Sequence, residues 1–240
     1  MSYLLYCIFG TSARQDIGLP TGVWRQPVIV AVHNGLSAAL SDLGKSDLVF
    51  DISQTLAYEN VVEHFFRDQT VIPMRYGCQL ENPFELISLL EDHHGEYQKL
   101  LGELEGMNEM GIRVLFEEAE AEDKTDTPLV PPEMSRGFSS SGTAYLAAKR
   151  EQFLSLDQAV LDQNLLVDEI CGSLSGLFVR RKMESPDLTR TRLLSLYFLV
   201  PRASVESFRR ATHSLHLKES VKLLLSGPWP PYNFVDFLES

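Results

Sequence analysis

The histidines of this chain could bind a metal ion, but neither of their two groups has the spacing of a metal site. His93 and His94 stand among acidic residues, yet neighbouring residues on a helix point in different directions. His213 and His216 lie about one helical turn apart without a cysteine or a His-Glu motif beside them. The sequence therefore predicts surface histidines and no metal site.

The three cysteines, Cys7, Cys78 and Cys171, could act as nucleophiles or redox centres only with partners that the sequence lacks. They are far apart, are odd in number, and have no Cys-x-x-Cys spacing or neighbouring histidine. Widely spaced free thiols are typical of a reducing compartment. Neither common glycine-rich phosphate loop occurs. These patterns predict a cytoplasmic protein that is not an enzyme and takes no cofactor.

Arg75 is the most distinctive charged residue, because it follows Val71-Ile72-Pro73-Met74 in a short apolar strand. Proline cannot donate to a strand ladder, so this strand is expected at a sheet edge or a strand end. A guanidinium in that setting needs carboxylate or carbonyl acceptors, or an aromatic ring such as Tyr76. Pairing inside the fold and contact with a partner both meet this need, and the sequence leaves the choice open.

Residues 226–234 combine three prolines with three aromatic residues. Proline fixes φ and lacks an N–H, so this stretch cannot be a helix interior or a central strand. We expect a stiff, extended segment that displays Trp229, Tyr232 and Phe234 and loses little entropy when the rings dock. The rings either pack on the protein's own core or anchor a partner. Both hold if some rings face inward and others outward.

Residues 226–234 resemble the C-terminal signature of the gas vesicle proteins GvpF and GvpL. Three other stretches are similar to the same family and occur in its order. They are the opening strand at Tyr3–Ile8, the Pro-x-Arg-aromatic-Gly segment at Thr70–Gly77, and the start of a long helix at Gly142–Arg150. The agreement spans nearly the whole chain, which makes it more specific than any one stretch.

The chain departs from the family pattern at two places. Tyr58 precedes Glu59 where the family often has histidine, and Met110 precedes Gly111 where it often has tryptophan. Any role of the family's histidine or tryptophan is therefore not carried over to these positions.

The resemblance implies a minor shell component or assembly factor of gas vesicles, which are gas-filled shells built mainly from one small, very hydrophobic protein. The implied partners are that main gas vesicle shell protein and other gas vesicle accessory proteins. The candidate partner-binding residues are Trp229, Tyr232 and Phe234, with Arg75 in second place. Two other functions stay open: an enzyme or small-molecule binder built on ferredoxin-like domains, and an assembly scaffold that uses a coiled-coil arm.

The net charge of −12 is carried by one half of the chain. Residues 1–123 hold 7 basic and 20 acidic residues, whereas residues 124–240 hold 14 and 13. An acidic chain is unsuited to nucleic acid, because phosphate binding depends on basic surface. No apolar run reaches the roughly 18 residues of a membrane span, and no leader-like segment precedes the first strand. We therefore expect neither a membrane span nor a signal peptide.

The first part of the chain alternates strand-like and helix-like patterns. Its expected elements are strands near residues 3–9, 27–32, 46–51, 71–77 and 111–117 and helices over 53–70 and 82–104. A helix pair that covers one face of an antiparallel sheet gives an α+β, two-layer domain, here assigned to residues 1–118. The resemblance implies a modified ferredoxin-like fold for this domain, which agrees with that order.

Residues 119–138 are charged and proline-rich without periodicity, and are expected to form a linker. The second domain, residues 139–240, is expected to be α+β, with a long helix over 141–181, a buried strand at 220–225, a further strand at 193–200 and a helix over 204–213. The long helix carries a heptad-like apolar stripe of Leu146, Phe153, Leu156, Val160, Val167, Ile170, Leu174 and Leu177. Its positively charged end would be Arg180–Lys182. The stripe either packs on the chain's own sheet or forms a coiled-coil contact.

Overall fold

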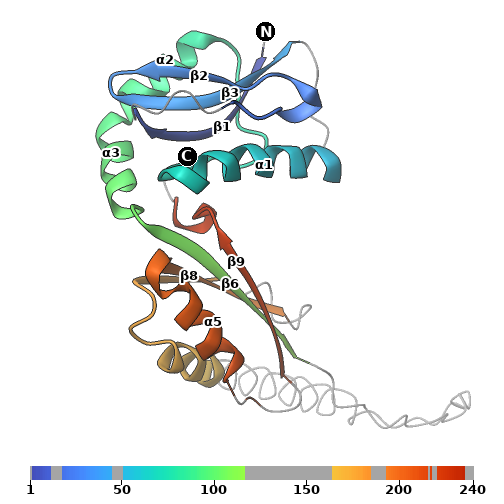
Figure 1. The fold of residues 1–240 in the computed structure, drawn as a ribbon, viewed down its shortest axis with the longest axis vertical. Helices are drawn as coiled ribbons and strands as arrows, with labels where there is room; N and C mark the ends of the chain where they lie inside the picture. Colours follow the sequence, from blue (N-terminus) through green and yellow to red (C-terminus); the bar gives the residue numbers. More distant parts are fainter. Residues whose placement is uncertain are drawn as a thin grey trace, which may run out of the picture.

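The computed structural model describes residues 2–11, 18–44, 51–116, 164–184, 193–215, 217 and 221–235. These residues form two antiparallel sheets with helices packed on them (Figure 1). The expected α+β class is therefore confirmed. None of the helices in this part of the chain is both long and apolar enough to cross a membrane.

The first sheet has β1 at its centre. Its strands are β1 (Ser2–Gly10), β2 (Ile29–His33), β3 (Leu36–Gly44), β4 (Val71–Pro73) and β5 (Gln79–Leu80). The order is β2-β3-β1-β4, and β5 also pairs with β1. The proline-bearing strand β4 lies at an edge, as Pro73 predicts, since its missing N–H cannot serve a central ladder.

Helices cover both faces of this sheet, so the expected two-layer arrangement is wrong. α1 (Ile52–Asp68) packs on the face that carries Tyr6 and Phe9, while Leu5 and Ile8 face the opposite side. That opposite side is covered by α2 (Pro83–Asp92) and α3 (His94–Glu103). The physical reason is β1, whose side chains are apolar on both faces and must be covered twice.

The expected helix over 82–104 is interrupted. Asn82 caps α2 as predicted, and its Oδ1 accepts the backbone N–H groups of Phe84 and Glu85. His93 then leaves the helical region, with φ −110° and ψ 15°, and α3 starts at the next residue. The break divides the expected helix into α2 and α3, which both pack on the face of the sheet that carries Leu5 and Ile8.

The third strand of the described chain is β3, which the sequence pattern did not predict. The expected strand at 46–51 lies outside the described residues except for its last residue. The Asn34-Gly35 turn joins β2 to β3 with positive φ at both residues, 46° and 81°. This is the backbone conformation that two-residue hairpins favour. β3 was not predicted from the sequence because its Leu-Ser-Ala-Ala segment lacks the β-branched and aromatic residues that are typical of strands.

The second sheet has β6 at its centre. Its strands are β6 (Met107–Phe116), β7 (Arg180–Glu184), β8 (Leu193–Pro201) and β9 (Val221–Trp229), in the order β7-β8-β6-β9. β6 therefore does not extend the first sheet, where the strand at 111–117 was expected, but pairs with β8 and β9. Helical residues 164–173 and α5 (Val205–His213) pack together on one face of this sheet.

The expected helix over 141–181 does not reach Arg181. Residues 164–173 are helical, a turn follows, and Gly176 adopts a φ of 80°, a left-handed conformation that ends helices. The chain then enters β7, so Arg180–Lys182 belong to a strand and are not a helix end. The N-terminal part of the expected helix and the expected linker at 119–138 lie outside the described residues.

Both sheets share one strand order. In each, the second strand pairs with the third, the third with the first, and the first with the fourth, all antiparallel. This is the arrangement of a β-α-β-β-α-β unit, the ferredoxin-like motif. In the first sheet the 3-10 turn η1 (Val23–Arg25) lies between β1 and β2, where the second sheet has helical residues 164–173. The division of the chain into two domains stays a prediction.

Candidate functional site

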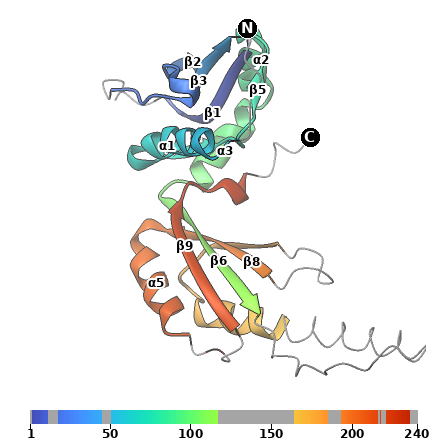
Figure 2. The ribbon, with the colours of Figure 1, turned by 90° about the vertical axis from the view of Figure 1, so that its right-hand side faces the viewer.

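Residues 226–234, here called the aromatic ribbon, leave the edge strand β9 and run between the two sheets (Figure 2). At Gly227 the backbone takes a φ of 105°. Pro230 and Pro231 are buried, and a 3-10 turn, η3 (Tyr232–Phe234), follows. The strand that leads into the ribbon alternates half-buried and exposed residues over 221–225, so the expectation of a buried strand at 220–225 is wrong. The described helices of this sheet pack on one face, so Val221, Leu223 and Leu225 are half-buried and the residues between them are exposed.

Phe234 belongs to the core. Its side chain is 3% exposed and packs in the cluster that contains Leu5, Leu100 and Leu199. The guanidinium carbon of Arg180 lies 5.7 Å from the centre of the Phe234 ring. This ring therefore joins residues of the first sheet to residues of the second.

Tyr232 packs against buried residues of α1. It is partly buried against the cluster that contains Tyr58 and Val62. Burial raises the pKa of the Tyr232 hydroxyl well above its ordinary value, and the nearby Cys7 and Glu59 side chains add to this effect. The hydroxyl thus stays protonated at physiological pH, as a neutral group beside the carboxylates of α1.

Glu109 and Asn233 fasten the ribbon to β6. The backbone N–H of Asn233 donates to Glu109 Oε2 at 2.8 Å, and its Nδ2 donates to Oε1 at 2.6 Å. Glu109 is 4% exposed. Burial raises the pKa of this carboxyl to about 7, although the two hydrogen bonds from Asn233 act in the opposite direction. A carboxyl group that titrates near neutral pH therefore sits at the base of the ribbon.

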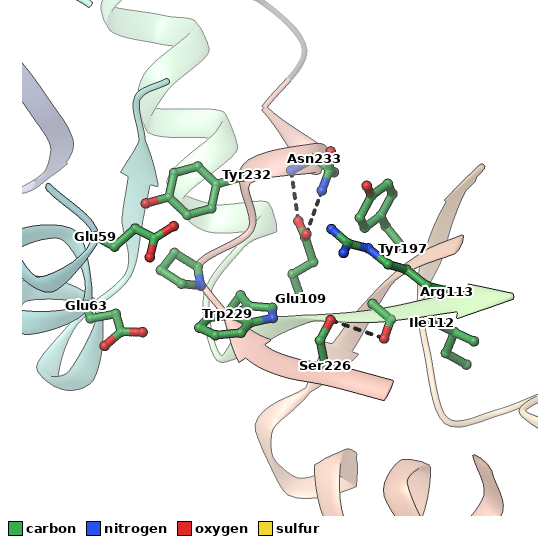
Figure 3. A pocket seen from close by; sticks show the side chains of 12 residues that line it. Glu59, Glu63, Glu109, Ile112, Arg113, Tyr197, Ser226, Trp229, Tyr232 and Asn233 are labelled. Atoms are coloured by element: carbon green, nitrogen blue, oxygen red, sulfur yellow. Dashed lines mark hydrogen bonds between the residues drawn. The ribbon is translucent and has the colours of Figure 1, made fainter. Parts of the chain in front are cut away.

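Trp229 is the ring of the ribbon that faces outward, with 41% of its surface exposed. It lines a groove of about 310 Å³ between α1 and the face of the second sheet that is opposite α5 (Figure 3). Glu59 and Glu63 of α1 form one wall. The remaining lining is contributed by Glu109, Gly111, Ile112, Arg113, Tyr197, Ser226, Pro230, Tyr232 and Asn233.

Two small residues of the lining, Gly111 and Ser226, pack closely against each other. A Cβ at Gly111 would lie 2.7 Å from the Ser226 Oγ, closer than atoms pack. Ser226 Oγ itself donates to the Gly111 carbonyl at 3.4 Å. A side chain at position 111 would therefore have to displace the Ser226 hydroxyl.

Replacing Gly227 with alanine is expected to destabilise the ribbon by about 1–3 kcal/mol. The φ of 105° is disfavoured for a side-chain-bearing residue, and the added Cβ would lie 2.6 Å from the Glu109 backbone oxygen. The measurement is denaturant unfolding followed by circular dichroism. Gly95→Ala is the control, because a Cβ there meets nothing within 4 Å. Equal stability of the two variants would contradict the tight approach of β9 to β6.

Arg75 lies apart from this groove. It is exposed just after the edge strand β4 and is not among the residues that line the groove. Of the four residues predicted to bind a partner, Trp229 and Tyr232 are brought together at the groove, Phe234 is in the core, and Arg75 is on a separate surface.

The histidines predicted to be surface residues make ordinary surface contacts. His93 Nδ1 lies 2.9 Å from Glu96 Oε2, and His94 Nε2 lies 2.8 Å from the Asn34 carbonyl oxygen. Within the described ranges, no three His, Cys, Asp or Glu side chains are grouped to hold a metal ion.

Sequence reasoning missed the acidic wall and Glu109. Glu59 and Glu63 are spaced by four residues, which places both on one side of α1, but this spacing is common on solvent-facing helices. Glu109 lies in a run of buried residues on β6, and nothing in the sequence marked this carboxylate as buried. Only the pairing of β6 with β9 brings it to the ribbon.

The family model described as gas vesicle synthesis protein GvpL/GvpF matches residues 2–236 of the chain. Gas vesicle protein F1 of Halobacterium salinarum is 21% identical over 95% of this chain and 91% of its own length. Gas vesicle protein F of a Streptomyces species is 24% identical over 88% of this chain and 89% of its own length.

Two crystal structures have a similar fold. GvpF from Anabaena sp. aligns with a TM-score of 0.70 and 18% identity, covering 98% of this chain and 95% of that one. GvpF from Microcystis aeruginosa aligns with a TM-score of 0.74 and 14% identity, covering 98% of both chains. The likeness thus extends over both sheets and the ribbon between them.

Proposed function

Because the chain belongs to the gas vesicle synthesis protein GvpL/GvpF family, we propose that it is a non-catalytic accessory protein of gas vesicle assembly. In this proposal it binds the main gas vesicle shell protein and limits the aggregation of that hydrophobic partner while the shell is built. Contacts with other gas vesicle accessory proteins belong to the same proposal. The family match and the relatives named F and L support the gas vesicle role.

The outward position of Trp229 supports direct contact with the shell protein. Pro230, Pro231 and Phe234 of the ribbon are buried, yet the Trp229 indole is 41% exposed at the mouth of a groove. Leu224, on the same strand, is 55% exposed. Aromatic side chains held in a rigid frame at a cavity are the usual anchors of protein interfaces, because they bury a large area and lose little entropy.

The other predicted anchors take different places in this proposal. Tyr232 supports Trp229 from the wall of the groove, and Phe234 holds the ribbon without touching a partner. Arg75 remains a second contact candidate on another surface, since it is exposed beside β4. An acidic chain around this apolar contact would keep the complex with a hydrophobic client in solution.

Replacing Trp229 with alanine is expected to weaken suppression of shell-protein aggregation by about tenfold, as loss of an interface anchor does. The shell protein is diluted from denaturant into increasing concentrations of the accessory protein, and light scattering is followed. Circular dichroism checks that the variant is folded.

Phe84→Ala is the matched control, because Phe84 is a 77% exposed ring on α2, away from the groove. Equal loss in both variants would point to general surface hydrophobicity rather than a Trp229 anchor. No suppression by the unchanged protein, relative to an equally acidic unrelated protein, would rule out the chaperone-like role.

A further inference from the structure

One side of α1 carries a stripe of apolar and acidic residues that faces away from the core. Ile52, Leu56, Glu59 and Glu63 follow one another at spacings of four, three and four, which places them on the same side of a helix. Ile52 is 79% exposed and Leu56 is 53% exposed. The stripe thus begins apolar and ends acidic, and its acidic end is the wall of the groove.

The two carboxylates of this wall face an aromatic surface. Figure 3 shows Glu59 and Glu63 on one side of the groove and Trp229 on the facing side. No ion pair to either carboxylate occurs within the described residues. Among the described residues of the lining, Arg113 is the one cationic side chain, and it comes from β6 and lies beside Tyr197, at the other end of the groove.

We propose that this groove receives a basic side chain, arginine in preference to lysine, from an apolar segment of a partner protein. The cation lies between the Trp229 ring and the carboxylates of Glu59 and Glu63. The apolar residues that flank it on the partner continue along Leu56 and Ile52. This inference rests on the proposed function for the identity of the partner as a gas vesicle protein.

The chemistry of the walls selects an organic cation. A guanidinium stacks on an indole face and at the same time donates hydrogen bonds from its edge to carboxylates. A metal ion would instead require several oxygen ligands at short range, and the described residues group no three metal-binding side chains. The volume of about 310 Å³ accommodates one long side chain rather than a whole helix.

The groove chemistry is tested with the full chain and two short peptides, acetyl-Leu-Ala-Arg-Ala-Leu-amide and the same peptide with citrulline in place of arginine. Citrulline keeps the shape of arginine but removes its charge. Trp24→Phe is introduced first, which leaves Trp229 as the sole tryptophan, and its fluorescence is followed at constant ionic strength. We expect the arginine peptide to bind at least about fivefold more tightly than the citrulline peptide, as a desolvated cation–π and carboxylate contact would give. Equal affinities for the arginine and citrulline peptides would overturn the proposal.

Charge-neutral variants identify the acidic wall as the source of this preference. Glu59→Gln with Glu63→Gln is expected to abolish the difference between the two peptides. The control removes the same charge elsewhere, by Asp68→Asn with Asp92→Asn, both exposed and absent from the groove lining. Preference retained in the groove variant, or lost equally in the control, would contradict the proposal.

Binding of the main shell protein to the same variants separates this inference from the proposed function. If the groove binds arginine and is also the docking site of the shell protein, Glu59→Gln with Glu63→Gln weakens shell-protein binding at least about fivefold. The remaining binding is also less sensitive to salt. Shell-protein binding that survives this change would overturn the groove as its docking site and leave the proposed function standing. Arginine-peptide preference without any shell-protein binding would instead overturn the proposed function and leave the groove as a site for a different partner.

Discussion

Replacing Phe234 with alanine is expected to lower the free energy of unfolding by about 3–5 kcal/mol, the usual cost of emptying a buried aromatic site. The ring is 3% exposed and contacts residues of both sheets, so its loss leaves a cavity where the two sheets meet. The Arg180 guanidinium would also lose the ring that it now faces. Urea unfolding followed by circular dichroism measures the effect.

Trp229→Ala is the control from the same ribbon. Because Trp229 is 41% exposed, its removal is expected to change stability by less than the loss of Phe234. The opposite order, with Phe234→Ala as stable as the unchanged protein but deficient in shell-protein binding, would assign Phe234 to the partner surface. The comparison therefore separates the ring that holds the ribbon from the ring that the ribbon displays.

Glu109→Gln is expected to remove roughly 3 kcal/mol of pH-dependent stability, from about 1.36 kcal/mol per unit of pKa difference. The pKa of Glu109 is raised from the ordinary 4.5 to about 7 in the folded protein. Between these values the folded state keeps a proton that the unfolded state has released. Stability from this group is therefore full below about pH 4.5 and is lost as the pH rises through about 7.

The measurement is the unfolding free energy of the unchanged protein and the variant from about pH 4.5 to about pH 8, a range that spans both pKa values. The unchanged protein should lose stability relative to Glu109→Gln as pH rises, by up to about 1.4 kcal/mol per pH unit. The glutamine side chain keeps one acceptor for Asn233, so the variant forfeits about 1 kcal/mol at all pH values. Glu105→Gln, at an exposed position, should leave the profile unchanged. Parallel profiles for Glu109→Gln and the unchanged protein would exclude this titration.

In the function proposed here, the aromatic ribbon combines core packing with partner contact, the two roles that its sequence left open. Phe234 and the Glu109–Asn233 hydrogen bonds fix it between the sheets. The same fixation holds Trp229 at the groove, where flexible chain would otherwise have to be ordered on binding. The packing of Phe234 and Asn233 thus holds Trp229 in the position that the proposed partner contact requires.

Local constraints were predictable from the sequence. Pro73 placed its strand at a sheet edge, and Asn82 marked the start of α2. The prolines of the ribbon indicated an extended chain that is not a central strand of a sheet. The structure agrees, because the ribbon begins in the edge strand β9. Each of these features depends on a missing N–H, a fixed φ or a side-chain cap, and all three act within a few residues.

Strand pairing was decided only by the tertiary structure. β6 follows α3 closely and therefore looked like a strand of the first sheet, yet it pairs with β8 and β9, far along the chain. A strand pattern records which faces are buried but not which strand lies beside it. The groove has the same origin, because Glu59 of α1, Glu109 of β6 and Trp229 of β9 meet only through that pairing. The sequence alone determined the family and the stiff ribbon, whereas long-range packing determined which of its rings is buried and which is displayed.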